Sequence, residues 1–138
     1  MKKITIPAKI ENLPQAIDFI NQQLKPFEPI SQAQLQLELA VEEVYVNIAK
    51  YAYEPGEGKV FISCEIDENP LQATVQFTDS GIPYNPIDNK APDMKSREKE
   101  VGGLGIFLIK KNVDDISYQY QDGKNILTIR KKLGTNIQ

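Results

Sequence analysis

The sequence has no histidine and no tryptophan, and it has one cysteine among 138 residues. Without histidine, the chain cannot carry a Ser-His-Asp or Cys-His nucleophile, a histidine metal ligand or a phosphohistidine. The lone cysteine, Cys64, excludes an internal disulfide, and its alternation with apolar residues indicates core packing. General base catalysis by this chain must therefore use a carboxylate.

Strong charge and long apolar segments are also missing. The net charge is −3, so the chain has no basic field for nucleic acid. No apolar run approaches the roughly 20 residues that span a bilayer, and Pro7, Lys9 and Glu11 interrupt the start before a secretory signal could form. The length suits one domain. We therefore expect a single domain over residues 1–138, in the cytoplasm, without a nucleic-acid or membrane partner.

Hydrophobic periodicity predicts a series of helices and strands. Ser31 is predicted to be the N-cap of the longest helix. Asp122-Gly123 is predicted to form the turn of the last hairpin. These elements predict an α+β fold, a two-layer sandwich with helices on one face of a mixed, mostly antiparallel sheet. The predicted helices cover residues 13–24, 31–53 and 104–113, and the predicted strands cover residues 3–9, 59–67, 71–78, 116–120 and 125–132.

One polar pair lies on the flank of the longest predicted helix. Glu43 and Asn47 are four residues apart, so their side chains lie on the same side of the helix. A carboxylate and a carboxamide together can act as general base and as an oxygen ligand for Mg²⁺. Alone, such a pair is usually a solvated helix flank.

A second polar pattern, Asp79-Ser80-Gly81, follows a predicted strand. Asp and Gly commonly form turns, which is its simplest interpretation. In a nucleotide site, the ionised carboxylate of Asp79 would accept a hydrogen bond from the amine of adenine, and Gly81 would let the backbone approach the base closely.

A glycine cluster, Gly102-Gly103-Leu104-Gly105, follows a segment of roughly 20 residues that is too long for an ordinary connection. The cluster is either a hinge or the start of a helix whose free amides bind phosphate. The three patterns, in this order, indicate an ATP site much more strongly than any one of them.

These residues resemble those of a known family. The run from Ala40 to Tyr53 resembles the N-box of GHKL-type (Bergerat-fold) ATPases, and more narrowly that of anti-sigma-factor serine/threonine kinases. The run from Asp79 to Pro86 is similar to the first glycine box of that branch, and the glycine cluster with Val113-Asp114-Asp115 is similar to the second. The closing strand also looks like the family's last strands, so the likeness covers nearly all of the chain from Ser31. Pro83 and Asn85 depart from the commoner glycine and acidic residue.

The resemblance implies a role for each matching residue. It implies that Glu43 is the catalytic base, that Asn47 binds Mg²⁺ and that Lys50 lies near the phosphates of ATP. It also implies that Asp79 and Gly81 hold adenine. Further implied contacts are phosphate binding by Gly102, Gly103, Leu104 and Gly105, a lid over residues 85–101, and support of the adenine site by the hydroxyl of Thr128.

The leading hypothesis is an Mg²⁺-ATP-dependent serine/threonine kinase that acts as an anti-sigma regulatory factor. The resemblance implies two partners, a STAS-type anti-anti-sigma protein as substrate and a sigma factor that is sequestered, and it allows a homodimer. The alternative is a nucleotide-dependent binding module without phosphotransfer. The catalytic half of a histidine kinase is disfavoured by the absent histidine and the short chain.

Overall fold

The computed structural model describes residues 2–53, 56–87 and 97–134, with the backbone alone for residues 97–104. Short 3₁₀ turns flank the first α-helix, and a π-helical turn follows the second. The main elements are β1 (Lys2–Pro7), α1 (Leu13–Leu24), α2 (Ser31–Asn47), the π-turn η3 (Ile48–Ala52), β2 (Lys59–Asp67), β3 (Gln72–Asp79), α3 (Arg97–Asn112), β4 (Asp115–Gln121) and β5 (Lys124–Lys132).

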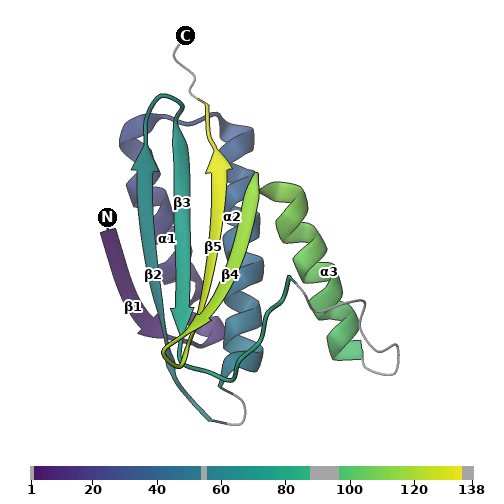
Figure 1. Ribbon diagram of the computed structural model, residues 1–138. Helices are drawn as coiled ribbons and strands as arrows, with labels where there is room; N and C mark the ends of the chain where they lie inside the picture. Colours follow the sequence, from purple (N-terminus) through teal and green to yellow (C-terminus); the bar gives the residue numbers. More distant parts are fainter. Residues whose placement is uncertain (1, 54–55, 88–96, 135–138) are drawn as a thin grey trace.

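The strands form one sheet in the order β1-β2-β3-β5-β4. Helices α1 and α2 lie against one face of this sheet, and α3 lies alongside α2 at the β4 side (Figure 1). The predicted α+β two-layer sandwich is confirmed. Each neighbouring pair of described strands is antiparallel, so the sheet is antiparallel here rather than mixed.

The core lies between the helices and the sheet. Along β3 every second residue is buried, because successive side chains of a strand point to opposite faces. Asp79 ends this buried row, so the same alternation that buries Val75 and Phe77 also places a carboxylate on the helix side of the sheet. The buried stripe of α2, at helical spacing, comprises Leu37, Ala40, Val41, Val44 and Tyr45.

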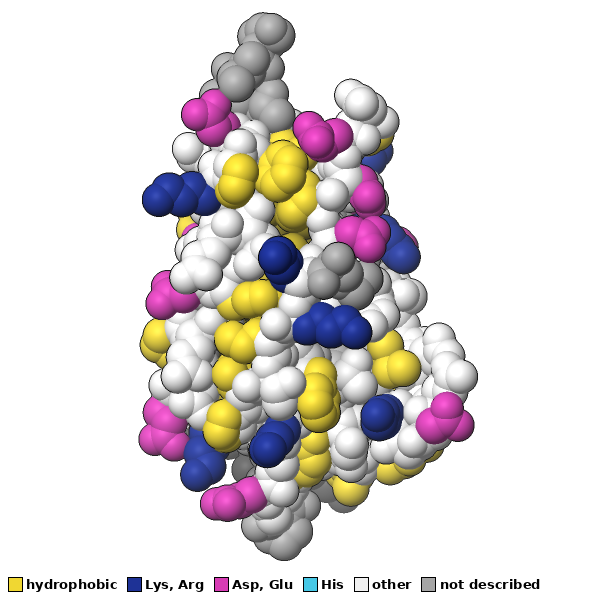
Figure 2. Space-filling view, turned by 90° about the vertical axis from the view of Figure 1, so that its left-hand side faces the viewer, with side chains coloured by type: hydrophobic (Ala, Val, Ile, Leu, Met, Phe, Trp, Pro, Cys, Tyr) yellow, Lys and Arg dark blue, Asp and Glu magenta, His cyan; other side chains and the backbone are white. Residues whose placement is uncertain are grey.

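The β1 edge of the sheet faces the viewer in Figure 2, where Lys and Arg side chains, in dark blue, lie between apolar ones in yellow. Lys2 and Lys3 begin this strand, and Pro7 ends it. Charged side chains and proline at a sheet edge hinder pairing with a further strand.

The long predicted helix starts at the expected residue but ends differently. Ser31 is its first residue, and Ile30 is the N-cap, so the prediction that Ser31 caps the helix was wrong. The amide of Ile30 donates to the carbonyl of Leu133, the residue after β5, and this contact holds the start of α2 against the sheet. At the other end, the α-helical pattern stops at Asn47 and η3 continues it.

Helix α3 begins seven residues earlier than predicted, at Arg97 instead of Leu104. The residues before the glycines, Arg-Glu-Lys-Glu, are good helix formers, and they outweigh the glycines as helix breakers. Part of the predicted lid therefore belongs to α3, and residues 88–96 of it lie outside the described residues. Within the described ranges, no helix combines the length and apolar character needed to cross a bilayer.

Candidate nucleotide site

A pocket lies between the helical layer and the sheet, at the end of β3. Its walls are mostly apolar, with a carboxylate from Asp79 and carboxamides from Asn47 and Asn125 among them. A mostly apolar cleft with a few converging polar groups is typical of a small-molecule site. The lining residues are Val44, Asn47, Ile48, Tyr51, Ala52, Phe77, Asp79, Ile82, Tyr84, Pro86, Ile109, Tyr118, Asn125 and Leu127.

Asp79 is the buried carboxylate of this pocket, with 5% of its surface exposed. Its Oδ1 accepts a hydrogen bond from the Gly81 amide at 2.9 Å and another from Asn125 Nδ2 at 2.9 Å. Two N–H donors on one oxygen fix the plane of the carboxylate. The structure thus presents an oriented acceptor inside an apolar pocket.

Gly81 is required by a close approach of two backbone segments. A Cβ at this position would lie 2.1 Å from the Ala52 carbonyl oxygen, which is far inside van der Waals contact. The same carbonyl accepts a hydrogen bond from the Ile82 amide at 3.0 Å. The close approach that the structure shows at Gly81 is to the π-turn η3, and the approach of this backbone to a bound base stays a prediction. A second hydrogen bond joins the same two segments, because the Tyr53 hydroxyl accepts from the Ser80 amide at 2.8 Å.

Glu43 and Asn47 lie side by side, as predicted, and both face α3. A Cβ at Gly105 would lie 3.1 Å from Glu43 Oε2 and 3.2 Å from Asn47 Nδ2. The structure therefore brings one residue of the glycine cluster directly onto the polar pair. Asn47 also lines the pocket, so this pair marks the α2 and α3 end of the same cavity.

The environment of Glu43 raises the pKa of its carboxyl. Partial burial raises the pKa of this carboxyl above its usual value, the neighbouring Glu42 charge raises it further, and the Lys50 charge lowers it. A general base near a phosphoryl group works best when its pKa lies closer to neutrality. The direction of the shift suits that role.

The glycine cluster lies inside α3. Since α3 begins at Arg97, the amides of Gly102, Gly103, Leu104 and Gly105 are in the helical interior. The expectation that the glycines begin the helix and offer free amides was therefore wrong for this structure.

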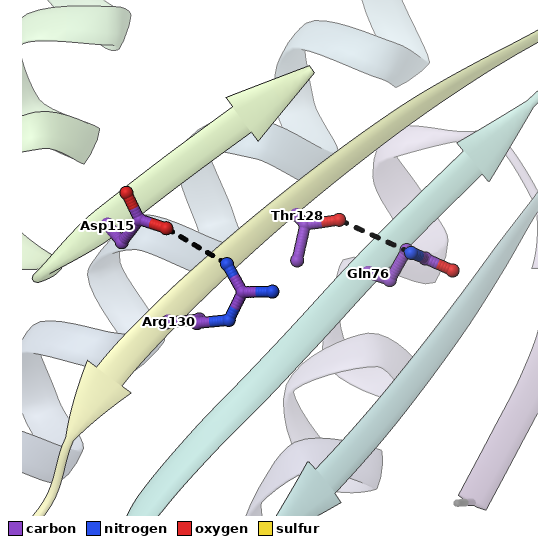
Figure 3. Close-up of polar contacts among 4 residues, drawn as sticks. All are labelled: Gln76, Asp115, Thr128 and Arg130. Carbon is purple, nitrogen blue, oxygen red and sulfur yellow. Dashed lines mark hydrogen bonds and ion pairs between the residues drawn. The ribbon is translucent and has the colours of Figure 1, made fainter. Parts of the chain in front are cut away.

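Lys50 and Thr128 lie outside the pocket lining. Lys50 is exposed on η3, close enough to Glu43 to affect its pKa. Thr128 accepts a hydrogen bond from Gln76 Nε2 at 3.3 Å, on the sheet face away from the helices, next to the Asp115 and Arg130 ion pair (Figure 3). The structure does not bring the Thr128 hydroxyl to the pocket, because residues of β5 alternate between faces and Asn125 and Leu127 point to the helix side.

Asn125 is a polar pocket residue that sequence reasoning missed. Its side chain binds Asp79, as described above, and its Oδ1 accepts from the Tyr84 amide at 3.1 Å. An asparagine just after the Asp122-Gly123 turn is a common hairpin residue, so the sequence contains no signal of this role. Only the pairing of Asn125 with Asp79 in the sheet register reveals it.

The polar residues suit a magnesium nucleotide better than a metal held by protein alone. Among the described residues, there is no group of three or more Cys, Asp or Glu side chains that could hold a metal ion. Mg²⁺ bound with a nucleotide usually takes one or two protein oxygens and completes its shell with phosphate oxygens and water. The Asn47 carboxamide next to the Glu43 carboxylate fits that pattern.

Curated relatives resemble this chain at modest identity. The serine-protein kinase RsbW of Listeria innocua is 27% identical over 106 residues, which covers 66% of this chain and 61% of that protein. The serine/threonine-protein kinase BtrW of Bordetella bronchiseptica is 27% identical over 95 residues, covering 67% and 66% respectively. This chain thus spans less than two thirds of the length of these relatives.

Solved structures share the fold. The histidine kinase domain of a blue-light activated histidine kinase from Erythrobacter litoralis EL346 superposes with a TM-score of 0.58 at 16% identity, over 93% of this chain and 62% of that chain. The histidine kinase AdeS of Acinetobacter baumannii gives 0.54 at 14% identity, over 96% and 69%. The family model of the histidine kinase-like ATPase domain matches residues 6–131. Because this match spans nearly all of the sandwich and its pocket, the chain belongs to the histidine kinase-like ATPase domain family.

Proposed function

We propose that this chain is an Mg²⁺-ATP-dependent serine/threonine protein kinase. The observation that carries the proposal is the pocket itself, in which the buried, oriented Asp79 carboxylate shares one cavity with Asn47, and Glu43 stands beside Asn47. The relatives named as serine or serine/threonine kinases support the type of acceptor.

Different residues along the pocket have different roles in this proposal. Asp79 accepts the hydrogen bond of the base amine, and the apolar walls exclude water from the ring. Asn47 would contribute an oxygen ligand to Mg²⁺. When bound, ATP supplies the phosphoryl group, and Mg²⁺ neutralises the charge on its oxygens.

Glu43 completes the site as the general base. Its carboxylate would take the proton of the acceptor hydroxyl while that oxygen attacks the γ-phosphorus of ATP and ADP leaves. The raised pKa of Glu43 makes it a better base near neutral pH. Since Gly105 lies against both Glu43 and Asn47, the N-terminal part of α3 has to move or shorten if the glycine amides are to reach phosphates.

The finer part of the proposal concerns the partners. The resemblance of the sequence to anti-sigma-factor kinases supports a STAS-type anti-anti-sigma protein as the substrate and a sigma factor as the sequestered partner. Phosphorylation adds about two negative charges to the substrate surface, which is enough to weaken one complex relative to the other.

The test is phosphotransfer from labelled ATP to a STAS protein encoded beside this chain, with and without EDTA. The expected result is label on a serine or threonine of the STAS protein, lost when the metal is chelated. A metal-dependent rise in melting temperature with ATP, without transfer to any STAS protein, would instead support the nucleotide-dependent binding module.

A further inference from the structure

The Asn125 side chain lies at the centre of a polar network that borders the pocket, with 7% of its surface exposed. Its Nδ2 donates to Asp79 Oδ1 at 2.9 Å and to the Ile82 carbonyl at 2.8 Å. Its Oδ1 accepts from the Tyr84 amide at 3.1 Å and from the Tyr118 hydroxyl. These contacts use both N–H donors of the carboxamide and both lone pairs of its oxygen.

This arrangement leaves Asn125 with no donor for a ligand, so any influence on a bound base must pass through its neighbours. The first of these is Asp79. The Gly81 amide and Asn125 Nδ2 both hold Oδ1, and none of the described residues donates to Oδ2. Every fully buried side-chain oxygen or nitrogen in the described part of the chain has a hydrogen-bond partner. Because Oδ2 has no such partner, it is not fully buried, and it is open to the pocket that Asp79 lines.

The network also joins segments that are far apart in the sequence. Asn125 is on β5, Tyr118 is on β4, and Ile82 and Tyr84 are in the loop after β3. One carboxamide therefore fixes the loop and the carboxylate relative to the closing hairpin. Burial raises the pKa of the Tyr118 hydroxyl, which keeps it protonated and able to donate.

We infer that Asn125 is a positioning residue for base recognition, which turns Asp79 Oδ2 toward the position of a purine amine and thereby selects adenine over a 6-oxo purine. This inference rests on the proposed function, because it assumes that a nucleotide base occupies the pocket. It assigns to Asn125 the support of the adenine site that the family resemblance implied for Thr128.

The test compares the affinities of ATP and inosine triphosphate, measured by calorimetry with Mg²⁺ for the full chain. Inosine triphosphate has the same phosphates and ribose but lacks the amine. In Asn125→Ala, the preference for ATP should fall about tenfold, the value expected when a hydrogen bond to a charged group is lost. The affinity for inosine triphosphate should change little, because the oxygen that replaces the amine cannot donate a hydrogen bond to Oδ2.

Thr128→Val is the matched control. Thr128 is on the same strand and is equally buried, at 8% exposure against 7%, but it faces the other side of the sheet. It should keep the preference of the parent chain for ATP. A loss of ATP and inosine triphosphate affinity in equal proportion in Asn125→Ala would show a merely structural role and overturn the inference.

A milder variant covers the case in which Asn125→Ala does not fold. Tyr118→Phe removes one donor to Asn125 Oδ1 and leaves Asp79 intact, so a smaller loss of ATP preference, about threefold, is expected. An unchanged preference in this variant would overturn the inference. If the parent chain binds neither nucleotide, the proposed function fails as well; if it binds ATP with an unaltered preference in the variants, only the role of Asn125 fails.

Discussion

The two ends of the pocket are built in different ways. At the base end, Asp79, Asn125 and Gly81 are buried or closely packed, and their hydrogen bonds join β3, β5 and the loop between β3 and α3. At the phosphate end, Glu43 and Asn47 are half-buried on the flank of α2, and Gly105 of α3 lies against them.

This difference separates recognition from chemistry. The groups that would read the base also hold the sheet and the loop together, so the base end is formed by the fold itself. The groups that would handle the phosphates lie between two helices and contribute little to the core. Changes at the base end should therefore cost stability, and changes at the phosphate end should cost function with the fold intact.

The largest effect is expected for Glu43→Gln on phosphotransfer. Loss of a general base typically lowers the rate by about 10²- to 10⁴-fold, while nucleotide affinity should stay within a few fold. Single-turnover transfer at saturating ATP measures it. A variant as fast as the parent would remove Glu43 as the base and would leave the phosphate end without an assigned catalyst.

Gly81→Ala should produce the largest loss of stability. Its Cβ would meet the backbone oxygen of Ala52 at 2.1 Å, so η3 or the loop has to shift, at a cost of about 3 kcal/mol by urea unfolding. Gly123→Ala is the control: its φ of +76° disfavours a side chain, but nothing lies within 4 Å of the added Cβ. We expect a loss of about 1 kcal/mol there. Equal losses in the two variants would contradict the close approach at Gly81.

Asp79→Asn tests whether recognition and fold can be separated at the base end. Asparagine can keep Oδ1 as the acceptor for Gly81 and Asn125, but it places an N–H₂ donor where Oδ2 stood. ATP affinity should fall about tenfold or more, because two donors then face each other. Calorimetry with tripolyphosphate provides the control, and an equal loss for both ligands would argue against base recognition by Asp79.

Asn47→Ala should remove most of the dependence of ATP affinity on Mg²⁺, roughly a tenfold effect. The melting temperature should change little, since Asn47 is half-buried on the helix flank. Titrations with and without EDTA measure the dependence. If Mg²⁺ strengthens ATP binding as much in the variant as in the parent chain, the metal lies elsewhere.

The smallest effect concerns stability and pH. Because the folded-state pKa of Glu43 is raised, its ionised form is disfavoured by folding, so Glu43→Gln should raise the melting temperature slightly at neutral pH. The gain should be full above the folded-state pKa and should vanish as the pH falls below the unfolded value of 4.5, where both states bind the proton. A variant less stable than the parent at neutral pH would contradict this sign.

Much of the architecture could be predicted from local patterns. The strict alternation of Gln72–Asp79 and the helical spacing in Leu13–Leu24 lead directly to β3 and α1. The order of α and β elements then leaves few arrangements other than a two-layer sandwich. The start of α3 was mispredicted because three glycines in four residues look like a helix boundary, although the preceding residues form helix.

The site was predicted in part. Glu43, Asn47, Asp79 and Gly81 were recognisable from their spacing and from the family resemblance, and the structure gathers them around one cavity or beside it. Thr128 was misplaced and Asn125 missed for one reason. A residue's face in a strand depends on strand register, and a shift of one residue moves every side chain to the other side of the sheet.

The sequence by itself determined the fold class, the absence of histidine chemistry and the order of the polar patterns, because these depend on composition and on short-range periodicity. Tertiary structure alone decided which groups meet. It set Asn125 on Asp79, the Ala52 carbonyl on Gly81 and Gly105 on the Glu43 and Asn47 pair. Such contacts join residues tens of positions apart, and they arise only when sheet register and helix packing bring distant segments to the same place.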